Sequence, residues 1–151
     1  MSPRLTPEEL KRAKEQKEQE EKEMAKYERQ QRKEEIKFRI RWEQISSELY
    51  GLYEELDKIY KKAPEEQISD LTVQNMNNLI KDTKEIIKGD PYIDRIKDFV
   101  PAGDNPEYRD VIMVLRQLRQ GLDRLKRSCF PGHESLSDLI EELQELDSEE
   151  E

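Results

Sequence analysis

The chain has 151 residues, of which 33% are hydrophobic and 42% are charged. Ordinary globular domains have roughly 45–50% apolar and about 25% charged residues. A composition with so few apolar residues can fill one modest hydrophobic core but not two. It favours long, exposed or paired helices, which bury only a narrow apolar stripe. The formal net charge of −9 arises in residues 134–151, which hold nine acids and no Lys or Arg, because the rest of the chain holds 27 acids and 27 bases.

The chain has one cysteine, Cys129, which excludes an intramolecular disulfide and fits a reducing compartment. Its first residues run directly into charged sequence without the pattern of a secretory signal. The longest apolar run, 111–115, is far shorter than the roughly 20 residues that a membrane span needs. We therefore expect a soluble, cytoplasmic protein, or a nuclear one in a eukaryote, with no membrane association.

Residues 1–35 predict a charged helical arm. Thr6, Pro7 and Glu9 match a capping box with proline in the first helical position. Residues 8–35 hold ten acids and nine bases, and pairs such as Glu28 and Arg32 are spaced to support an exposed helix. Few apolar residues occur here, so we expect the arm to be solvated. The end of the arm and the residues after it carry a basic cluster that is a candidate for nucleic-acid contact: Arg32, Lys33, Lys37, Arg39 and Arg41.

Two apolar seams follow, in each of which the spacing alternates between three and four residues. The first seam contains Phe38, Trp42, Ile45, Leu49, Leu52, Leu56 and Ile59. The second contains Tyr108, Val111, Leu115, Leu118, Leu122, Leu125 and Cys129. This spacing is the a/d pattern of helices that pack along their length. We expect the seams to pack against each other in one bundle; the alternative is that one or both form an intermolecular coiled coil.

Shorter helices are predicted between the seams. Residues 71–88 carry an apolar face, and Gly89 fits the C′ position that ends the helix. A short element over 91–99 follows, capped by Asp90-Pro91, and the loop 101–106 precedes the second seam. The predicted fold is all-α: a small antiparallel helical bundle with coiled-coil-like seams over 36–130, a long charged N-terminal helical arm over 1–35 and an acidic C-terminal amphipathic tail over 131–151.

The acidic tail is the best candidate for a partner-binding element. One face of it is apolar and the other is acidic, so it could be a last bundle helix or a helix that docks into a partner's groove. The apolar face contains Leu136, Leu139, Ile140, Leu143 and Leu146.

The second half of the second-seam helix is basic and could complement the helix dipole or dock something acidic. This candidate docking face contains Arg116, Arg119, Arg124 and Arg127. Because Phe130-Pro-Gly-His133 is a tight break, we expect the tail to fold back onto these arginines, which would bring Asp138, Glu141, Glu142 and Glu145 near them.

No catalytic or metal-binding constellation can be assembled from this sequence. Cys129 falls on the second seam and is expected in the core, and His133, the only histidine, is expected in a loop. The five glycines are scattered, so no phosphate-binding loop is present. Most carboxylates lie among Lys and Arg on polar helix faces. We expect no enzyme activity, no cofactor, no metal and no small-molecule substrate.

The sequence thus favours a protein–protein interaction module: an adaptor, a regulator or an assembly subunit. We expect a protein partner or a homo-oligomer. The alternative is a nucleic-acid-associated accessory protein that uses the basic patches, with the acidic tail as a competitor for them. The overall negative charge and the lack of a nucleic-acid-binding motif disfavour this alternative.

Overall fold

A computed structural model describes residues 4–99, 105–130, 132 and 134–149. The described chain is all-α, as the sequence predicted, with five helices: α1 (Pro7–Lys62), α2 (Asp70–Ile86), α3 (Pro91–Asp94), α4 (Tyr108–Cys129) and α5 (Leu136–Ser148). Apart from one isolated bridge between Gln67 and Glu107, the described residues contain no β-structure. The expected loop role of His133 falls outside the described residues.

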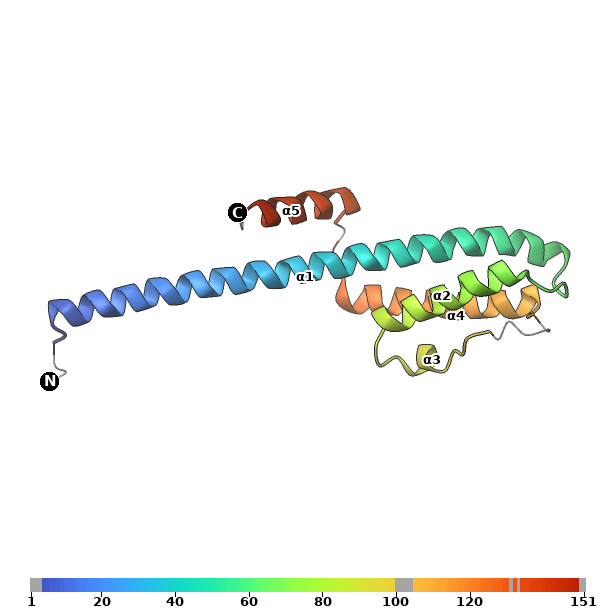
Figure 1. The fold of residues 1–151 in the computed structure, drawn as a ribbon, viewed down its shortest axis with the longest axis horizontal. Helices are drawn as coiled ribbons and strands as arrows, with labels where there is room; N and C mark the ends of the chain where they lie inside the picture. The colour runs from blue at the N-terminus through green and yellow to red at the C-terminus, as the bar shows by residue number, and fades with distance from the viewer. Residues whose placement is uncertain (1–3, 100–104, 131, 133, 150–151) are drawn as a thin grey trace.

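Helix α1 is a single helix of 56 residues that joins the predicted arm to the first seam. It begins as predicted, because the Thr6 hydroxyl accepts a hydrogen bond from the Glu9 amide and the Glu9 carboxylate accepts one from the Thr6 amide. It ends at Lys62, with Ala63 as the C-cap. The N-terminal part of α1 extends well beyond the other helices (Figure 1). Every residue from Arg4 to Glu28 is exposed, so this part adds no buried apolar side chain to the core.

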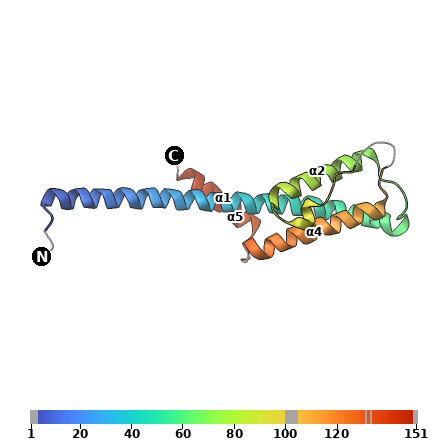
Figure 2. The same ribbon diagram turned by 90° about the horizontal axis from the view of Figure 1, so that it is seen from below.

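Helices α2 and α4 pack against the C-terminal half of α1, and α4 runs in the direction opposite to α1 (Figures 1 and 2). Residues of both seams share one buried cluster with residues of α2, among them Ile45, Met76 and Leu118. The indole Nε1 of Trp42 donates a hydrogen bond of 3.0 Å to the main-chain oxygen of Leu122, which ties α1 to α4. Leu52 is only half-buried, so the first seam is not evenly covered.

The connection between α2 and α4 contains the short element expected over 91–99. Its helical part is one turn, Pro91–Asp94, and the chain beyond it is irregular, with Ile93 and Ile96 buried. The Asn77 side chain holds this irregular segment by two hydrogen bonds of 2.8 Å to the main chain of Phe99. Because the Asn77 side-chain amide supplies hydrogen-bond partners for both the N–H and the C=O of Phe99, these groups do not need the hydrogen bonds of a helix.

The predictions for two residues at helix ends, Gly89 and Cys129, were wrong. Helix α2 ends with Ile87 as its C-cap, so Gly89, with φ of +83°, lies beyond the C′ position that the sequence suggested for it. Cys129 is exposed, although it falls on the second seam. It is the last residue of α4, and the aromatic ring of Phe130 covers the end of the core in its place by packing against Trp42.

Candidate interaction surface

Helix α5 lies across α1 near the middle of that long helix and contacts no other helix of the described chain (Figures 1 and 2). Its Ser135 caps it by accepting a hydrogen bond from the amide of Asp138. Leu139 is 2% exposed, and Ile36 of α1 is 1% exposed and lines the same cavity. Both lie outside the main buried cluster, so α5 and α1 make a small apolar contact of their own.

Arg32 is the main electrostatic link between the two helices. Its Nε atom lies 2.7 Å from Oε1 of Glu142, and a second guanidinium nitrogen lies 2.8 Å from Oε2 of the same carboxylate. That second nitrogen also lies 3.1 Å from Glu134, and Glu35 completes the set at 3.5 Å. Hydrogen bonding from Arg32 lowers the pKa of Glu142 below its usual range, because it stabilises the carboxylate form.

Two further ion pairs join the C-terminal end of α5 to α1. The Nζ atom of Lys33 lies 3.0 Å from Asp147, and the Lys33 side chain is 3% exposed. Arg29 lies 3.9 Å from Glu149. The C-terminal end of α5 therefore lies beside Arg29 and Lys33, and the two helices run in opposite directions (Figure 1).

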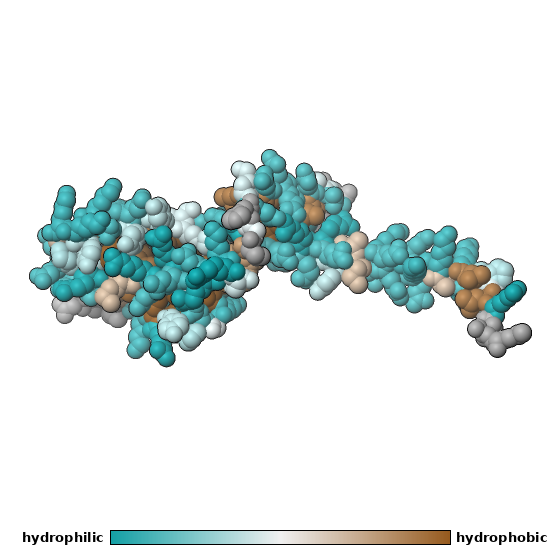
Figure 3. Space-filling model, turned by 180° about the vertical axis from the view of Figure 1, so that it is seen from behind, coloured by the Kyte–Doolittle hydropathy of each residue, from teal (hydrophilic) through white to brown (hydrophobic). Residues whose placement is uncertain are grey.

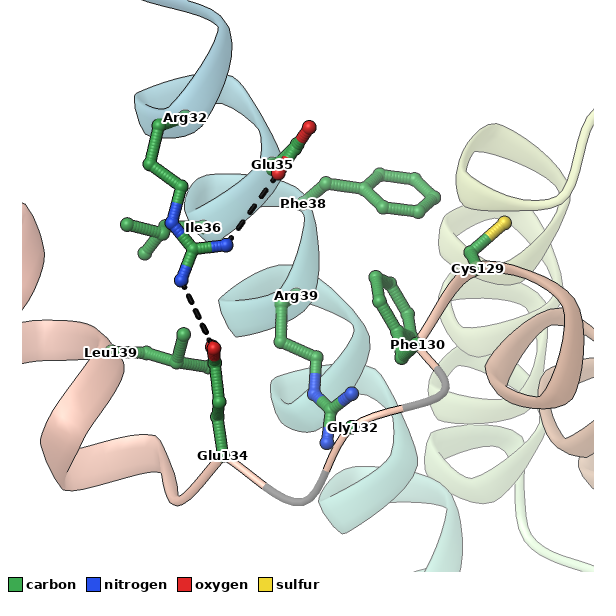
Figure 4. Close-up of a pocket in the computed structure, with 10 residues that line it drawn as sticks. All are labelled: Arg32, Glu35, Ile36, Phe38, Arg39, Cys129, Phe130, Gly132, Glu134 and Leu139. Carbon is green, nitrogen blue, oxygen red and sulfur yellow. Dashed lines mark hydrogen bonds and ion pairs between the residues drawn. The ribbon is translucent and has the colours of Figure 1, made fainter. Parts of the chain in front are cut away.

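A cavity of about 520 Å³ lies where the end of α4 passes into α5 (Figure 4). Phe38 and Phe130 line it, with ring centroids 5.5 Å apart. The Arg39 guanidinium lies 4.7 Å from the Phe130 ring centroid and 5.6 Å from that of Trp42, and Arg39 is 8% exposed. Its Nε atom lies 3.4 Å from Glu43, close enough for charge pairing but without hydrogen-bond geometry. Arg39 thus serves as an aromatic-stacked part of the wall.

The predicted apolar face of the tail is present but unevenly used. Leu139 is buried and Leu143 and Leu146 are half-buried, whereas Leu136 and Ile140 are 41% and 39% exposed. The structure therefore places three of these five residues on the α1 side and leaves two in solvent.

The expected fold-back of the tail onto the arginines of α4 is wrong. Arg116 lies 3.4 Å from the Tyr53 hydroxyl, Arg119 lies over the Tyr50 ring, and Arg124 lies 2.9 Å from Asp90. Arg127 is exposed, and none of the four makes an ion pair with α5. The reason is that α1 offers α5 both bases and a buried isoleucine, whereas three of these arginines already have partners on α1 or beside α3.

The basic cluster at the end of the predicted arm is also largely occupied within the chain. Arg32 and Lys33 bind α5, and Arg41 lies 3.4 Å from Asp82 of α2. The expected support of Arg32 by Glu28 is absent, because Arg32 pairs with Glu35, Glu134 and Glu142 instead. The sequence predicts these bases as a cluster, but their binding to the tail was not expected. The signal was available, since Arg29, Lys33 and Ile36 follow one another at helical spacing on a single face.

No protein-family model, curated protein or solved structure matches this chain. Across the described residues, no helix combines the length and apolar character needed to cross a membrane. Within the same residues, no three His, Cys, Asp or Glu side chains gather in a way that could hold a metal ion. The geometry of this surface is that of one helix held against another by a leucine and several ion pairs.

Proposed function

We propose that the protein is a non-catalytic protein–protein interaction module, an adaptor, a regulator or an assembly subunit, which binds its partner through the exposed half of α1 and the neighbouring α5. One observation carries this proposal: α1 projects beyond the bundle, and each residue of its projecting part, from Pro7 to Glu28, is exposed. Figure 3 shows this projecting part as a mainly hydrophilic rod with isolated apolar residues. A segment that adds nothing to the core is available to contact another molecule along its length.

Helix α5 supports the same proposal. Among the helices it contacts only α1, and only Leu139 among its residues is buried. The acids of its ion pairs are 38–60% exposed, and exposed pairs each contribute about 0–1 kcal/mol, so these pairs and one buried leucine are a weak attachment for a helix of 13 residues. A weakly held amphipathic helix can give up its contact with α1 and bind a partner's surface through the same apolar face.

Site-specific photo-crosslinking in the native host tests the proposal. A photo-reactive amino acid replaces Tyr27 on the arm, which is 61% exposed, or Tyr92 on α3, which is 68% exposed. We expect a discrete crosslinked protein from position 27 and none from position 92. Equal, diffuse crosslinking at both positions would contradict a partner site on the arm.

The nucleic-acid alternative has weaker support. Arg127 of α4 is exposed, but three other arginines of the same helix, Arg116, Arg119 and Arg124, already contact side chains of α1 or Asp90. Binding to phosphates would fall steeply as the salt concentration rises. Titration of an unlabelled oligonucleotide at two salt concentrations separates the two functions, since the interaction module is expected to show no such binding.

A further inference from the structure

One face of α1 carries a row of four basic residues that ends in a buried apolar residue. Lys22, Lys26, Arg29 and Lys33 are spaced by four, three and four residues, and Ile36 follows three residues later. This spacing places all five side chains on one side of an α-helix. We call this row the α1 stripe.

Helix α5 covers only the C-terminal part of the α1 stripe. Asp147 pairs with Lys33, Glu149 pairs with Arg29, and Ile36 is buried. Lys22 and Lys26 are exposed, and no described residue makes an ion pair with either of them. The stripe therefore continues for about two helical turns beyond the surface that α5 occupies.

We propose that the full α1 stripe, from Lys22 to Ile36, is the docking site for an acidic amphipathic helix of another protein, and that α5 holds part of this site until that helix replaces it. The inference rests on the proposed function and deepens it by naming the kind of partner. Two observations carry it: the uncovered bases continue an interface that already binds an acidic helix, and their charge complements such a helix.

The chemistry of α5 defines the partner. The helix should run antiparallel to α1 and carry leucines spaced as Leu139, Leu143 and Leu146 are, with acids beside them. It should be longer than α5 at its C-terminal end, with acids there that reach Lys26 and Lys22. The extra length matters because α5 is tethered to α4 and competes at a high effective concentration. A partner that made only the contacts of α5 would not displace it.

Peptide binding to the full chain tests the proposal. The probe is a fluorescein-labelled peptide of residues 134–149 extended at its C-terminal end by two helical turns, each with a glutamate on the stripe-facing side. We expect binding to wild-type chain, and about tenfold weaker binding to Lys22→Glu/Lys26→Glu, because attraction becomes repulsion at two positions. The matched control is Lys14→Glu/Lys17→Glu, exposed arm residues that lie off the stripe, which should change affinity less than about twofold.

Competition with α5 supplies the second measurement. Leu139→Asp removes the only fully buried side chain of α5, so we expect this variant to bind the probe about tenfold more tightly than wild type. In wild type, saturation with the probe should raise amide exchange in 136–148 and lower it in 22–36. Equal effects of the stripe and control substitutions, or unchanged exchange in α5 at saturation, would overturn the proposal.

Other occupants give different results, each of which also overturns it. A mixed-sequence oligonucleotide or an anionic lipid vesicle that binds more tightly than the peptide, through Lys22 and Lys26, would identify a phosphate surface. A dimer in light scattering that is lost in Lys22→Glu/Lys26→Glu would identify a second copy of the chain. Crosslinks at Tyr27 without peptide binding would reject the helical partner and leave the proposed function standing.

Discussion

Trp42 shows how one side chain can fix the relation between two long helices. Its ring is 5% exposed, its nitrogen donates to the main-chain oxygen of Leu122, and the ammonium of Lys126 lies 5.3 Å from its centroid. Because the bond joins the middle of α4 to the start of the first seam, it sets the register as well as the distance between the helices. A leucine at this position could pack but could not select the register.

Trp42→Phe is therefore expected to lower the free energy of unfolding by about 1–3 kcal/mol, from the lost hydrogen bond and the space left by the smaller ring. Urea denaturation followed by circular dichroism measures the free energy of unfolding of the variant and of the wild type. The control is Tyr50→Phe, on the same helix, whose ring is 51% exposed and should change stability by less than about 0.5 kcal/mol. Equal losses for the two variants would mean that the Trp42 bond contributes nothing.

The Glu142 carboxylate makes the attachment of α5 sensitive to acid. Its pKa is lowered by hydrogen bonds from Arg32, so attached α5 binds a proton less readily than detached α5. The attachment is at full strength above the usual Glu pKa of about 4.3 and is lost as the pH falls through the lowered value. Amide chemical shifts of 136–148 between about pH 7 and 3 should show detachment at the acid end. In Glu142→Gln that transition should shrink, with weaker attachment at pH 7; an unchanged profile would contradict the assignment.

Helix α4 approaches α3 closely at Gly121. An added Cβ there would lie 2.6 Å from Cδ1 and 2.7 Å from Cγ1 of Ile93, whose side chain is fully buried. Gly51, in the interior of α1, offers a contrast, because nothing lies within 4 Å of the Cβ position. The two glycines are in the same kind of helix and differ in what faces them.

Gly121→Ala should destabilise the fold by about 1–3 kcal/mol through overpacking, despite the gain in helix propensity. Gly51→Ala should stabilise it by about 0.5–1 kcal/mol, because alanine restricts the unfolded chain without a clash. Thermal unfolding of both variants gives the comparison. Stabilisation by both would show that Ile93 can yield, and that the close approach is not a constraint.

At the scale of the element, the sequence predicts features that depend on residues close together in the chain. The start of α1 depends on Thr6 and Glu9, three residues apart, and was predicted correctly. The helix against which α5 packs was predicted wrongly, as α4 in place of α1. The choice depends on which of the two basic surfaces also has an apolar residue to cover Leu139. Ile36 supplies that cover, and its burial depends on residues more than 100 positions away in the sequence. The irregular chain after α3 depends on a similarly non-local contact, since the Asn77 amide that holds Phe99 is 22 positions away in the sequence.

At the scale of the whole molecule, the contacts of α1 with α5 begin inside the segment predicted as the arm. Residues 29–33 look like arm sequence, but Arg29, Arg32 and Lys33 bind α5. Deletion of residues 1–24 should therefore leave the midpoint of thermal unfolding within about 3 °C of wild type, because it removes only exposed residues. Deletion of residues 1–33 should in addition release α5, visible as fast amide exchange in 136–148. A large fall in the midpoint after the shorter deletion would show that the arm supports the core.

The length of α1 has a consequence for how the molecule moves in solution. A helix of 56 residues is about 84 Å long at about 1.5 Å per residue, whereas a compact chain of 151 residues has a radius of gyration of about 15 Å. Such a rod raises the frictional drag on the particle without adding mass. A single 18.1 kDa chain will leave a size-exclusion column ahead of globular standards of its mass, at a volume easily mistaken for that of a dimer.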